Sequence, residues 1–504
     1  MIRVRLGFPS SAHRSVSDPP DAVRVGVAFA AIVLAMLPAV LDQTILATAL
    51  PTIAADLGRL SDLSWVVTAY VVAAAATTPL WGKLGDRHGR KRLLEVALAL
   101  FLGSSALCGI AQDLTMLIVS RSVQGVAAGG LMTLAMAAVG DLVSSRERGR
   151  YQGYIAATFA VATVVGPLVG GVLVQHVSWR WVFYVNLPLG LLALAGLTLR
   201  LPAPAVQRPP TRLDTVGAAL LAGATSAFLL ACIWGGDRYA WDSPTILGLL
   251  GATVLLGGAL VVRERRVDDP IVPFDLLRIP AVAIASVALF LTTASLFAIT
   301  VFVPLFLQTT TGASPTQAGL LLVPMMLGVT LSTNLAGRSI VRTGRYKRFP
   351  VAGLALMTAA LALLAAFAGD PSRTATGAAL VVFGLGFGMV GQVLIVAVQN
   401  SVDRRRLGVA MATTNFFRAL GGAVGAAVLG AIFAARAGGH ASAAAAVGRA
   451  DVVDAVQTVF TVAAPIAAVA LLVVLALKEV PLQGPGAPAP APEPAKPPVA
   501  AVAR

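Results

Sequence analysis

The sequence predicts an all-α integral membrane protein. Of its 504 residues, 57% are hydrophobic and only 12% are charged, whereas a soluble domain has about 25% charged residues. A soluble core of this length is not covered by so few charged groups. The apolar residues also fall into runs of about 20, the length of a helix that crosses a bilayer. Lys and Arg lie in short segments between these runs, which is typical of the loops of a membrane protein.

Fourteen apolar runs are long enough to cross the bilayer. Residues 279–337 contain no Asp, Glu, Lys or Arg over 59 residues, and the polar sequence TTTGASPTQ inside this stretch indicates a turn between two spans. The predicted spans are 25–49, 62–81, 93–112, 114–140, 152–175, 181–200, 213–234, 244–262, 281–307, 317–337, 350–368, 374–399, 407–435 and 454–477.

The distribution of basic residues predicts the orientation. With the N-terminus in the cytoplasm, 30 of the 38 Lys and Arg lie in inside segments, six lie in outside loops, and Arg121 and Arg418 lie within spans. Because cytoplasmic loops carry the excess of Lys and Arg, both termini are expected in the cytoplasm. The excess of arginine, 33 Arg against 5 Lys, is typical of a bacterium with a GC-rich genome. We therefore expect a multi-pass protein of the bacterial cytoplasmic (inner) membrane.

A strongly basic segment, GKLGDRHGRKR (Gly82–Arg92), separates two of the spans and is predicted to be a glycine-broken cytoplasmic turn. Part of its pattern recurs later in the chain, and chance similarity of two basic turns is the alternative explanation. The offsets of Gly82, Arg87 and Gly89 are repeated by Gly337, Arg342 and Gly344.

The repeat predicts two six-helix halves with an inserted pair of helices between them. The predicted division is a cytoplasmic N-terminal segment (1–24), an N-terminal half (25–200), a two-helix linker (201–280), a C-terminal half (281–478) and a cytoplasmic tail (479–504). The tail is rich in Pro and Ala, so we expect it to be disordered.

Asp42 is the acidic residue that lies well inside a predicted span. A carboxylate in hydrocarbon is costly unless it is paired, neutralised or facing water, so Asp42 is a functional candidate. Counted from the predicted outer ends of their spans, Asp42 and Arg121 both lie about 10 Å below the outer surface. We therefore expect them to lie at one depth, where burial and the arginine act on the carboxylate in opposite directions. A purely structural buried pair is the alternative.

The span 152–175 contains small residues and one proline, which loosen a helix and allow another helix to approach closely. Ordinary helix packing is the alternative explanation for this pattern. The residues are Gly153, Gly166, Pro167, Gly170 and Gly171.

Together these patterns resemble the major facilitator superfamily, and within it the fourteen-span drug:proton antiporters. The resemblance covers essentially residues 25–477, including the segment SWRWVFYVNLPLG at 178–190. Ala162 stands where the family's span-5 motif has a glycine, and the second basic segment lacks counterparts of two residues of the first. The family's signature loop is matched by Gly82, Gly85, Asp86, Arg87, Gly89 and Arg90.

The resemblance implies specific roles for these residues. It links Asp42 and Arg121 to proton coupling and the span-5 motif to export rather than import. Asp86 is expected to act in gating, near a helix N-terminus or an arginine, where a carboxylate is stabilising. For the basic residues of the loop, anchoring to anionic lipid is the alternative.

Polar side chains on several spans are the candidates for a central substrate cavity. Arg418 lies about eleven residues, or ~17 Å, from the cytoplasmic end of its span, near the midplane; its alternative role is a bond to helix-end carbonyls of a neighbour. The spans hold one acid against two arginines, which favours neutral or mixed substrates over obligate cations. The candidates are Gln43, Gln124, Gln308, Gln392, Asn415 and Arg418.

The sequence therefore predicts a monomeric proton-coupled antiporter that exports small hydrophobic or amphipathic compounds, such as drugs or antibiotics, by alternating access. No enzyme activity, nucleic-acid partner, cofactor or metal is expected: there is no Walker sequence, and Cys108 and Cys232 both lie in apolar runs. A dedicated exporter of one metabolite or amino acid is the first alternative. A non-transporting membrane sensor is the second, and an importer is disfavoured by the Gly166–Pro167 pair.

Overall fold

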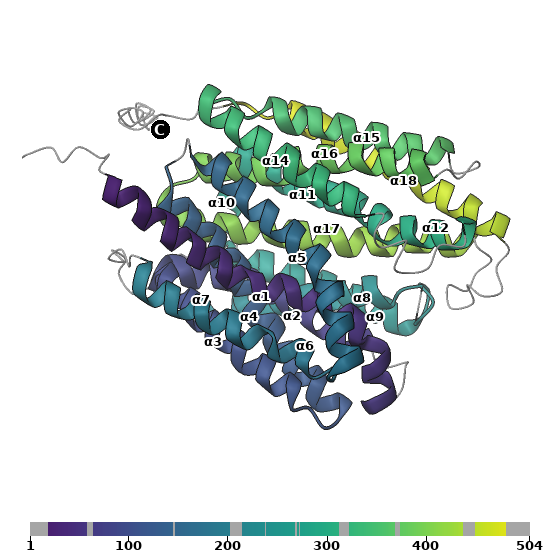
Figure 1. Ribbon diagram of the computed structural model, residues 1–504, viewed down its shortest axis with the longest axis horizontal. Helices are drawn as coiled ribbons and strands as arrows, with labels where there is room; N and C mark the ends of the chain where they lie inside the picture. The colour runs from purple at the N-terminus through teal and green to yellow at the C-terminus, as the bar shows by residue number, and fades with distance from the viewer. Residues whose placement is uncertain are drawn as a thin grey trace, which may run out of the picture.

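The described part of the chain is helical, and its long helices run side by side along the long axis of the molecule (Figure 1). The computed structural model describes residues 19–57, 64–144, 147–201, 214–236, 238–267, 270–271, 273–311, 322–367, 373–436 and 449–479. The predicted tail, and most of the predicted turn TTTGASPTQ, therefore lie outside the described residues.

The helices follow one another without a sheet in the described residues. In chain order they are α1 (Pro19–Leu57), α2 (Ser64–His88), α3 (Arg90–Gly109), α4 (Leu114–Leu142), α5 (Arg148–His176), α6 (Trp181–Tyr184), α7 (Asn186–Arg200), α8 (Thr215–Trp234), α9 (Pro244–Glu264), α10 (Phe274–Leu277), α11 (Pro280–Phe297), the π-helix η2 (Ala298–Phe302), α12 (Val303–Thr311), α14 (Val323–Thr343), α15 (Arg348–Phe367), α16 (Arg373–Ser401), the short η3 (Arg404–Arg406), α17 (Leu407–Arg436) and α18 (Arg449–Leu475).

The number of long helices agrees with the fourteen predicted spans. Within the described residues, thirteen helical segments are long and apolar enough to cross a membrane, counting α6–α7 and α11–η2–α12 as one segment each. The remaining long helix, α14, has 21 residues, about 31 Å at 1.5 Å per residue. It is less apolar because it carries polar residues, two of which, Ser332 and Thr333, are buried against neighbouring helices.

Several predicted boundaries are wrong because helices continue beyond the apolar runs. α1 begins at Pro19, inside the predicted N-terminal segment, and ends at Leu57. α2 continues through the first part of the predicted basic turn and ends at His88. The turn is made at Gly89 alone, which has φ 92°. Hydropathy marks where a helix leaves the hydrocarbon, whereas the helix itself ends only where the backbone changes conformation.

The two repeats make matching packing arrangements. α1 packs on α5 and α7, and α2 on α4, while α11 packs on α17 and α18, and α14 on α16. Between the two groups, α2 lies along α17 and α14 lies along α5. Gly344 ends α14 with φ 67°, as Gly89 ends α2, and both adopt a left-handed conformation that favours glycine. We refer to α1–α7 as the N-terminal group and to α11–α18 as the C-terminal group.

The pair α8 and α9 forms a hairpin whose first helix packs beside α2 and α17. Asp214 begins this hairpin, accepting a hydrogen bond from the Gly217 amide at 2.9 Å. Arg263, near the end of α9, donates to the same carboxylate from Nε at 2.9 Å. Although burial raises the pKa of Asp214, these hydrogen bonds outweigh burial and lower it.

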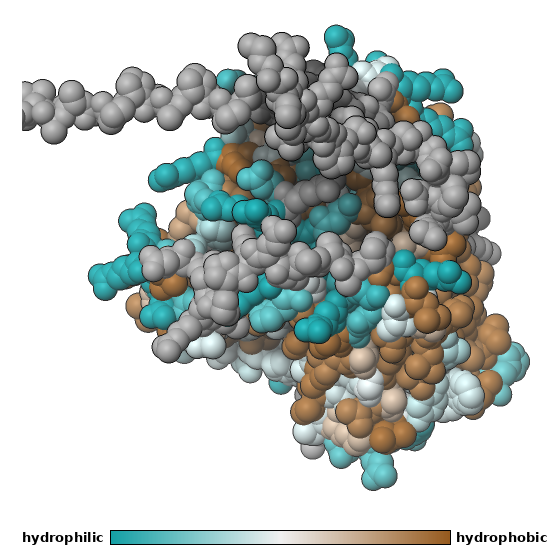
Figure 2. Space-filling model, turned by 90° about the vertical axis from the view of Figure 1, so that its left-hand side faces the viewer, coloured by the Kyte–Doolittle hydropathy of each residue, from teal (hydrophilic) through white to brown (hydrophobic). Residues whose placement is uncertain are grey.

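Hydrophilic side chains gather at the end of the molecule where α1 begins and where α2 and α14 end. Figure 2 faces this end, and apolar side chains border it on the flank. We call it the basic end, because it carries the segments 82–92 and 338–348. On the flanks, large apolar residues are exposed, among them Leu199 at 78% and Leu255 at 75%. Such surfaces are typical of helices in contact with lipid chains.

Candidate functional site

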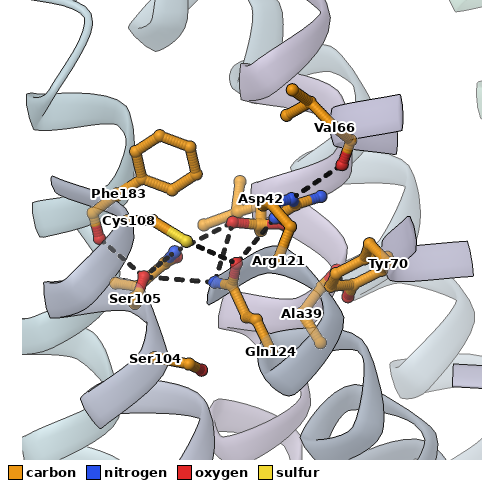
Figure 3. Close-up of polar contacts among 12 residues, drawn as sticks. Ala39, Asp42, Val66, Tyr70, Ser104, Ser105, Cys108, Arg121, Gln124 and Phe183 are labelled. Carbon is orange, nitrogen blue, oxygen red and sulfur yellow. Dashed lines mark hydrogen bonds and ion pairs between the residues drawn. The ribbon is translucent and has the colours of Figure 1, made fainter. Parts of the chain in front are cut away.

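Asp42 on α1 and Arg121 on α4 form a buried ion pair (Figure 3). Arg121 Nη1 donates to Asp42 Oδ2, and each side chain is 1% exposed. Arg121 Nε also donates to the Val66 carbonyl oxygen at 3.2 Å. Its guanidinium carbon lies 4.2 Å from the centroid of the Tyr70 ring. These further partners matter because a buried ion pair is stable only where the remaining donors are also satisfied.

Side chains from two more helices complete this site. Gln124 Nε2 and Asn186 Nδ2 donate to Asp42 Oδ1 at 3.1 and 3.3 Å. Both amides also donate to Ser105 Oγ, at 3.2 and 3.0 Å. The site therefore joins α1, α3, α4 and α7 inside the N-terminal group. We call Asp42, Ser105, Arg121, Gln124 and Asn186 the carboxylate cluster.

All of the described partners of Asp42 are donors, so the arrangement fits an ionised carboxylate. One acceptor beside it has no partner in the described structure: Asn186 Oδ1 is buried without a hydrogen bond. A protonated Asp42 has an O–H group that needs an acceptor. The cluster therefore holds the donors for the ionised form, and rotation of the Asn186 side chain would bring an acceptor toward the protonated form.

The sequence predicted part of this cluster. Asp42 and Arg121 were expected at one depth and are paired, while Gln124 was expected at a central substrate cavity; α1 continues 15 residues past Asp42 to Leu57, beyond the predicted span. Ser105 was missed, and Asn186 was noted only as part of a motif. The available signal was a polar side chain within an apolar run, which is a functional hint wherever it occurs.

Glycines of the span-5 motif lie where α5 contacts other helices. A Cβ atom on Gly166 would lie 2.0 Å from Thr44 Oγ1, and one on Gly170 would lie 2.3 Å from Thr48 Oγ1, so both permit the close approach of α1. Gly153 faces Asn334 of α14. Gly171 has open space around it and Pro167 is exposed, so these two do not contribute to the same contacts.

At the basic end, Asp86 joins the two groups. Its carboxylate accepts from the Gly408 and Val409 amides at the start of α17, both at 2.9 Å. Arg90 donates to the same carboxylate at 2.8 Å and also pairs with Asp141. A carboxylate at a helix N-terminus is stabilised by the free amides and by the helix dipole. Asp86 therefore lies beside both features that the sequence argument named, a helix N-terminus and an arginine.

The other residues of the signature segment have different surroundings. Gly82 lies against α17, where an added Cβ atom would be 2.5 Å from the Gly408 oxygen, and Gly85 lies against Leu134. Arg87 is half-buried. Gly82 and Gly85 thus act as contact positions within a helix and not as the turn that was predicted.

A second connection at the basic end was missed by the sequence argument. Arg148, at the start of α5, donates to the Gln399 carbonyl oxygen of α16 at 2.7 Å and to the Gly140 carbonyl oxygen at 2.5 Å. Gln399 Nε2 donates back to the Met136 carbonyl oxygen at 3.0 Å. Arg148 appeared only as one more loop arginine in the sequence, because its burial depends on the docking of the two groups.

A cavity of about 130 Å³ lies between the two groups. Two of the predicted cavity residues, Gln392 and Arg418, line it. Asn415 is half-buried, but it does not line this cavity, and Gln308 is half-buried on α12. Gln43 is exposed, and Gln124 belongs to the carboxylate cluster instead.

At the end opposite the basic end, a second cavity of about 470 Å³ opens between the ends of α1 and α5. Asp56 lies in it and accepts from Trp179 Nε1 at 2.9 Å and from Arg180 Nη1 at 3.0 Å. These hydrogen bonds lower the pKa of Asp56 below its ordinary value of 3.8. Across the residues that the structure describes, no group of three or more His, Cys, Asp or Glu is placed to hold a metal ion.

Comparison with known proteins gives a consistent result. The sequence profile of the Major Facilitator Superfamily matches residues 32–426. The chain is 42% identical over 414 residues to an uncharacterized MFS-type transporter of Mycobacterium tuberculosis (strain H37Rv), which covers 82% of this chain and 60% of that protein. It is 34% identical over 407 residues to the multidrug transporter protein MdtP of Bacillus subtilis (strain 168), covering 81% of this chain and 75% of that protein.

Among solved structures, the human organic anion transporter MFSD10 (TETRAN) is similar, with a TM-score of 0.65 over 91% of this chain and all of that one. At 17% sequence identity, this likeness concerns the fold alone. The proteins that the chain matches are transporters and not enzymes.

Proposed function

Because the chain belongs to the major facilitator superfamily and has its fold, we propose that it is a proton-coupled antiporter that exports small hydrophobic or amphipathic compounds. The observation that carries the proposal is the carboxylate cluster, in which one buried acid is held by donors from several helices. The name of the relative MdtP, a multidrug transporter, supports the choice of substrate class.

The contacts of Asp42 support a role for this site in proton coupling. A proton that binds Asp42 weakens its ion pair with Arg121, since the carboxylate loses its charge. Asn186 Oδ1 then offers an acceptor for the new O–H group. Protonation therefore changes the bonds between α1, α4 and α7, and substrate release is coupled to that rearrangement.

Alternating access requires the two groups to separate at one end and close at the other. In this structure they are joined at the basic end by Asp86 of α2, which accepts hydrogen bonds from α17, and by Arg148 of α5, which donates to α16. Separation of the basic end breaks both sets of bonds. We assign the basic end to the cytoplasm, on the distribution of Lys and Arg, in the cytoplasmic membrane of a bacterium, with the proton gradient as the energy source. The structure then corresponds to a state closed toward the cytoplasm.

The test is substrate-induced proton release in inverted vesicles, screened across dyes and antibiotics. Wild type is compared with Asp42→Asn and with Asp242→Asn, which changes an exposed carboxylate between α8 and α9. We expect the first variant to lose at least about tenfold of the coupled flux, because it removes the proton-binding group, and the control to keep it.

Each outcome has a distinct meaning. Flux that survives in Asp42→Asn contradicts coupling at this residue. Transport of one compound alone favours the dedicated exporter of a metabolite or amino acid over a multidrug exporter. Measurable binding without any flux contradicts transport and favours a membrane sensor.

A further inference from the structure

The cavity between the two groups has an uneven distribution of polar groups. Most of its wall is apolar, formed by side chains such as Phe159, Leu289 and Met325. Among the described residues that line it, Arg418 of α17 is the one with a charge. Gln392 of α16 and Thr292 of α11 are among its neutral polar residues.

No described residue forms an ion pair or hydrogen bond with Arg418. This contrasts with the buried Arg121, which has Asp42, Gln124 and the Val66 carbonyl as partners, whereas Arg418 is half-buried. A guanidinium group has five N–H donors and stays charged. An unpaired charge at this depth is costly, so its retention points to a partner that is not always present.

Two further polar atoms in the cavity wall also lack partners. Gln392 Oε1 and Thr292 Oγ1 are buried without hydrogen bonds in the described structure. Both accept hydrogen bonds, and the threonine hydroxyl also donates. The wall thus offers one fixed positive charge and two neutral polar contacts on an apolar background, which is the usual design of a ligand site.

We propose that this cavity selects organic monoanions with an apolar, aromatic body, and that Arg418 binds the anionic group. The inference rests on the proposed export function and adds a substrate class to it. A carboxylate or similar group satisfies the guanidinium through charge-assisted hydrogen bonds. An ammonium group meets an unpaired positive charge with no described acid beside it, so cations are disfavoured.

The size of the cavity limits what it holds in this state. Its volume of about 130 Å³ is close to that of an engineered protein cavity of ~150 Å³ that binds benzene. A single ring system with one charged group is therefore a suitable probe. Larger substrates need the additional space that forms when the two groups move apart.

The test measures the binding of three probes with one ring system and different charge to the purified full-length protein. The probes are benzoate, benzamide and benzylammonium, and calorimetry gives their affinities. We expect wild type to bind benzoate at least about tenfold more tightly than the amide, and the ammonium compound least. Saturable binding of the ammonium probe that equals or exceeds that of benzoate, or no saturable binding of benzoate, overturns the proposal.

Variants locate the effect. Arg418→Gln should remove the preference for benzoate over benzamide, whereas Arg418→Lys should keep most of it. Gln392→Glu places an acid in the same cavity and should turn the preference toward the ammonium probe. Arg436→Gln, on the same helix but at an exposed pair with Asp454, is the matched control and should behave as wild type. A preference that survives in folded Arg418→Gln contradicts the assignment, and the wild-type comparison remains decisive if that variant does not fold.

The outcome is separable from that of the proposed export function. Preferential binding of benzoate without proton-coupled flux supports the cavity assignment and contradicts export. Proton-coupled flux of cations alone supports export and contradicts the assignment of monoanions to Arg418.

Discussion

The side chain of Asp42 is fixed by donors from two other helices, and these donors compensate for its burial. Arg121 and Gln124 come from α4, and Asn186 comes from α7. Each donor bonds one of the two oxygen atoms of the same carboxylate, so loss of one donor weakens the hold on that side chain. Asn186 is the most informative to change, because its Nδ2 atom bonds Asp42 while its Oδ1 atom is free.

We predict that Asn186→Leu lowers the rate of proton-coupled transport about fivefold, since one hydrogen bond that holds the carboxylate is lost. Leucine keeps the branched shape of asparagine but has no polar atoms. The measurement is the rate of transport in vesicles. Ser104→Ala is the control: Ser104 bonds only carbonyl oxygens of its own helix, those of Leu100 and Phe101. An unchanged rate in Asn186→Leu would contradict its role in positioning the proton site.

At the scale of the element, the basic segment shows how a helix takes over a sequence that reads as a loop. Gly82 and Gly85 were expected to break the chain, yet they lie in α2, where they allow α17 and Leu134 to approach. Only Gly89 needs a left-handed conformation. A glycine in the sequence of a membrane protein can therefore mark either a close contact between helices or a turn. Only the position of the neighbouring helix shows which of the two it is.

The same packing gives Asp86 access to the start of α17. Its oxygen atoms satisfy two amides that have no partner within that helix. The equivalent position in the second repeat is Val341, so the contact between α14 and α5 has no such carboxylate. The α2–α17 interface thus contains a charged group that the α14–α5 interface lacks at the equivalent position. We expect the α2–α17 interface to be the more sensitive to loss of one side chain.

We predict that Asp86→Ala opens the basic end, because it removes an interaction of a kind worth about 0.5–2 kcal/mol. Spin labels at His88→Cys and Arg405→Cys, which are both exposed, report the opening as a longer mean distance by pulsed electron resonance. Asp113→Ala is the matched control: Asp113 accepts from the Met116 amide at 2.8 Å at the start of its own helix, without joining the two groups. Equal distance distributions in Asp86→Ala and wild type would refute a gating role.

At the scale of the whole molecule, the arrangement of basic residues and of helix ends makes one orientation in the membrane testable. The segments at 82–92 and 338–348 lie at the same end. Asp113, at the start of α4, and Trp179, between α5 and α6, lie at the end of the molecule opposite the basic end. If the basic end faces the cytoplasm, exposed residues at the two ends differ in their access to reagents outside the cell.

We predict that a membrane-impermeant maleimide labels Asp113→Cys in intact cells but not His88→Cys or Arg345→Cys, all three of which replace exposed residues. After permeabilisation, all three should react. The parent protein, with its cysteines Cys108 and Cys232, sets the background signal. Labelling of His88→Cys in intact cells would reverse the proposed orientation.

Prediction from the sequence worked where a property is local. Runs of apolar residues gave the helical class and the number of long helices, because each helix satisfies its own backbone and needs only enough apolar length to cross. The pairing of Asp42 with Arg121 was also accessible, since an isolated charge in hydrocarbon requires a partner. Asp42 and Arg121 lie on different predicted spans, and the spans offer few other charged residues that could pair with either.

The tertiary structure decided what depends on which helices touch. Ser105 and Asn186 join the carboxylate cluster, and Arg148 reaches Gln399, only because particular helix faces meet. Arg418 lies at a cavity without a described partner, while Gln43 is exposed, although both are polar residues on apolar spans. Hydropathy fixes the depth of a side chain along its helix but not its direction around the helix. That direction is set by packing between small residues, which composition alone does not encode.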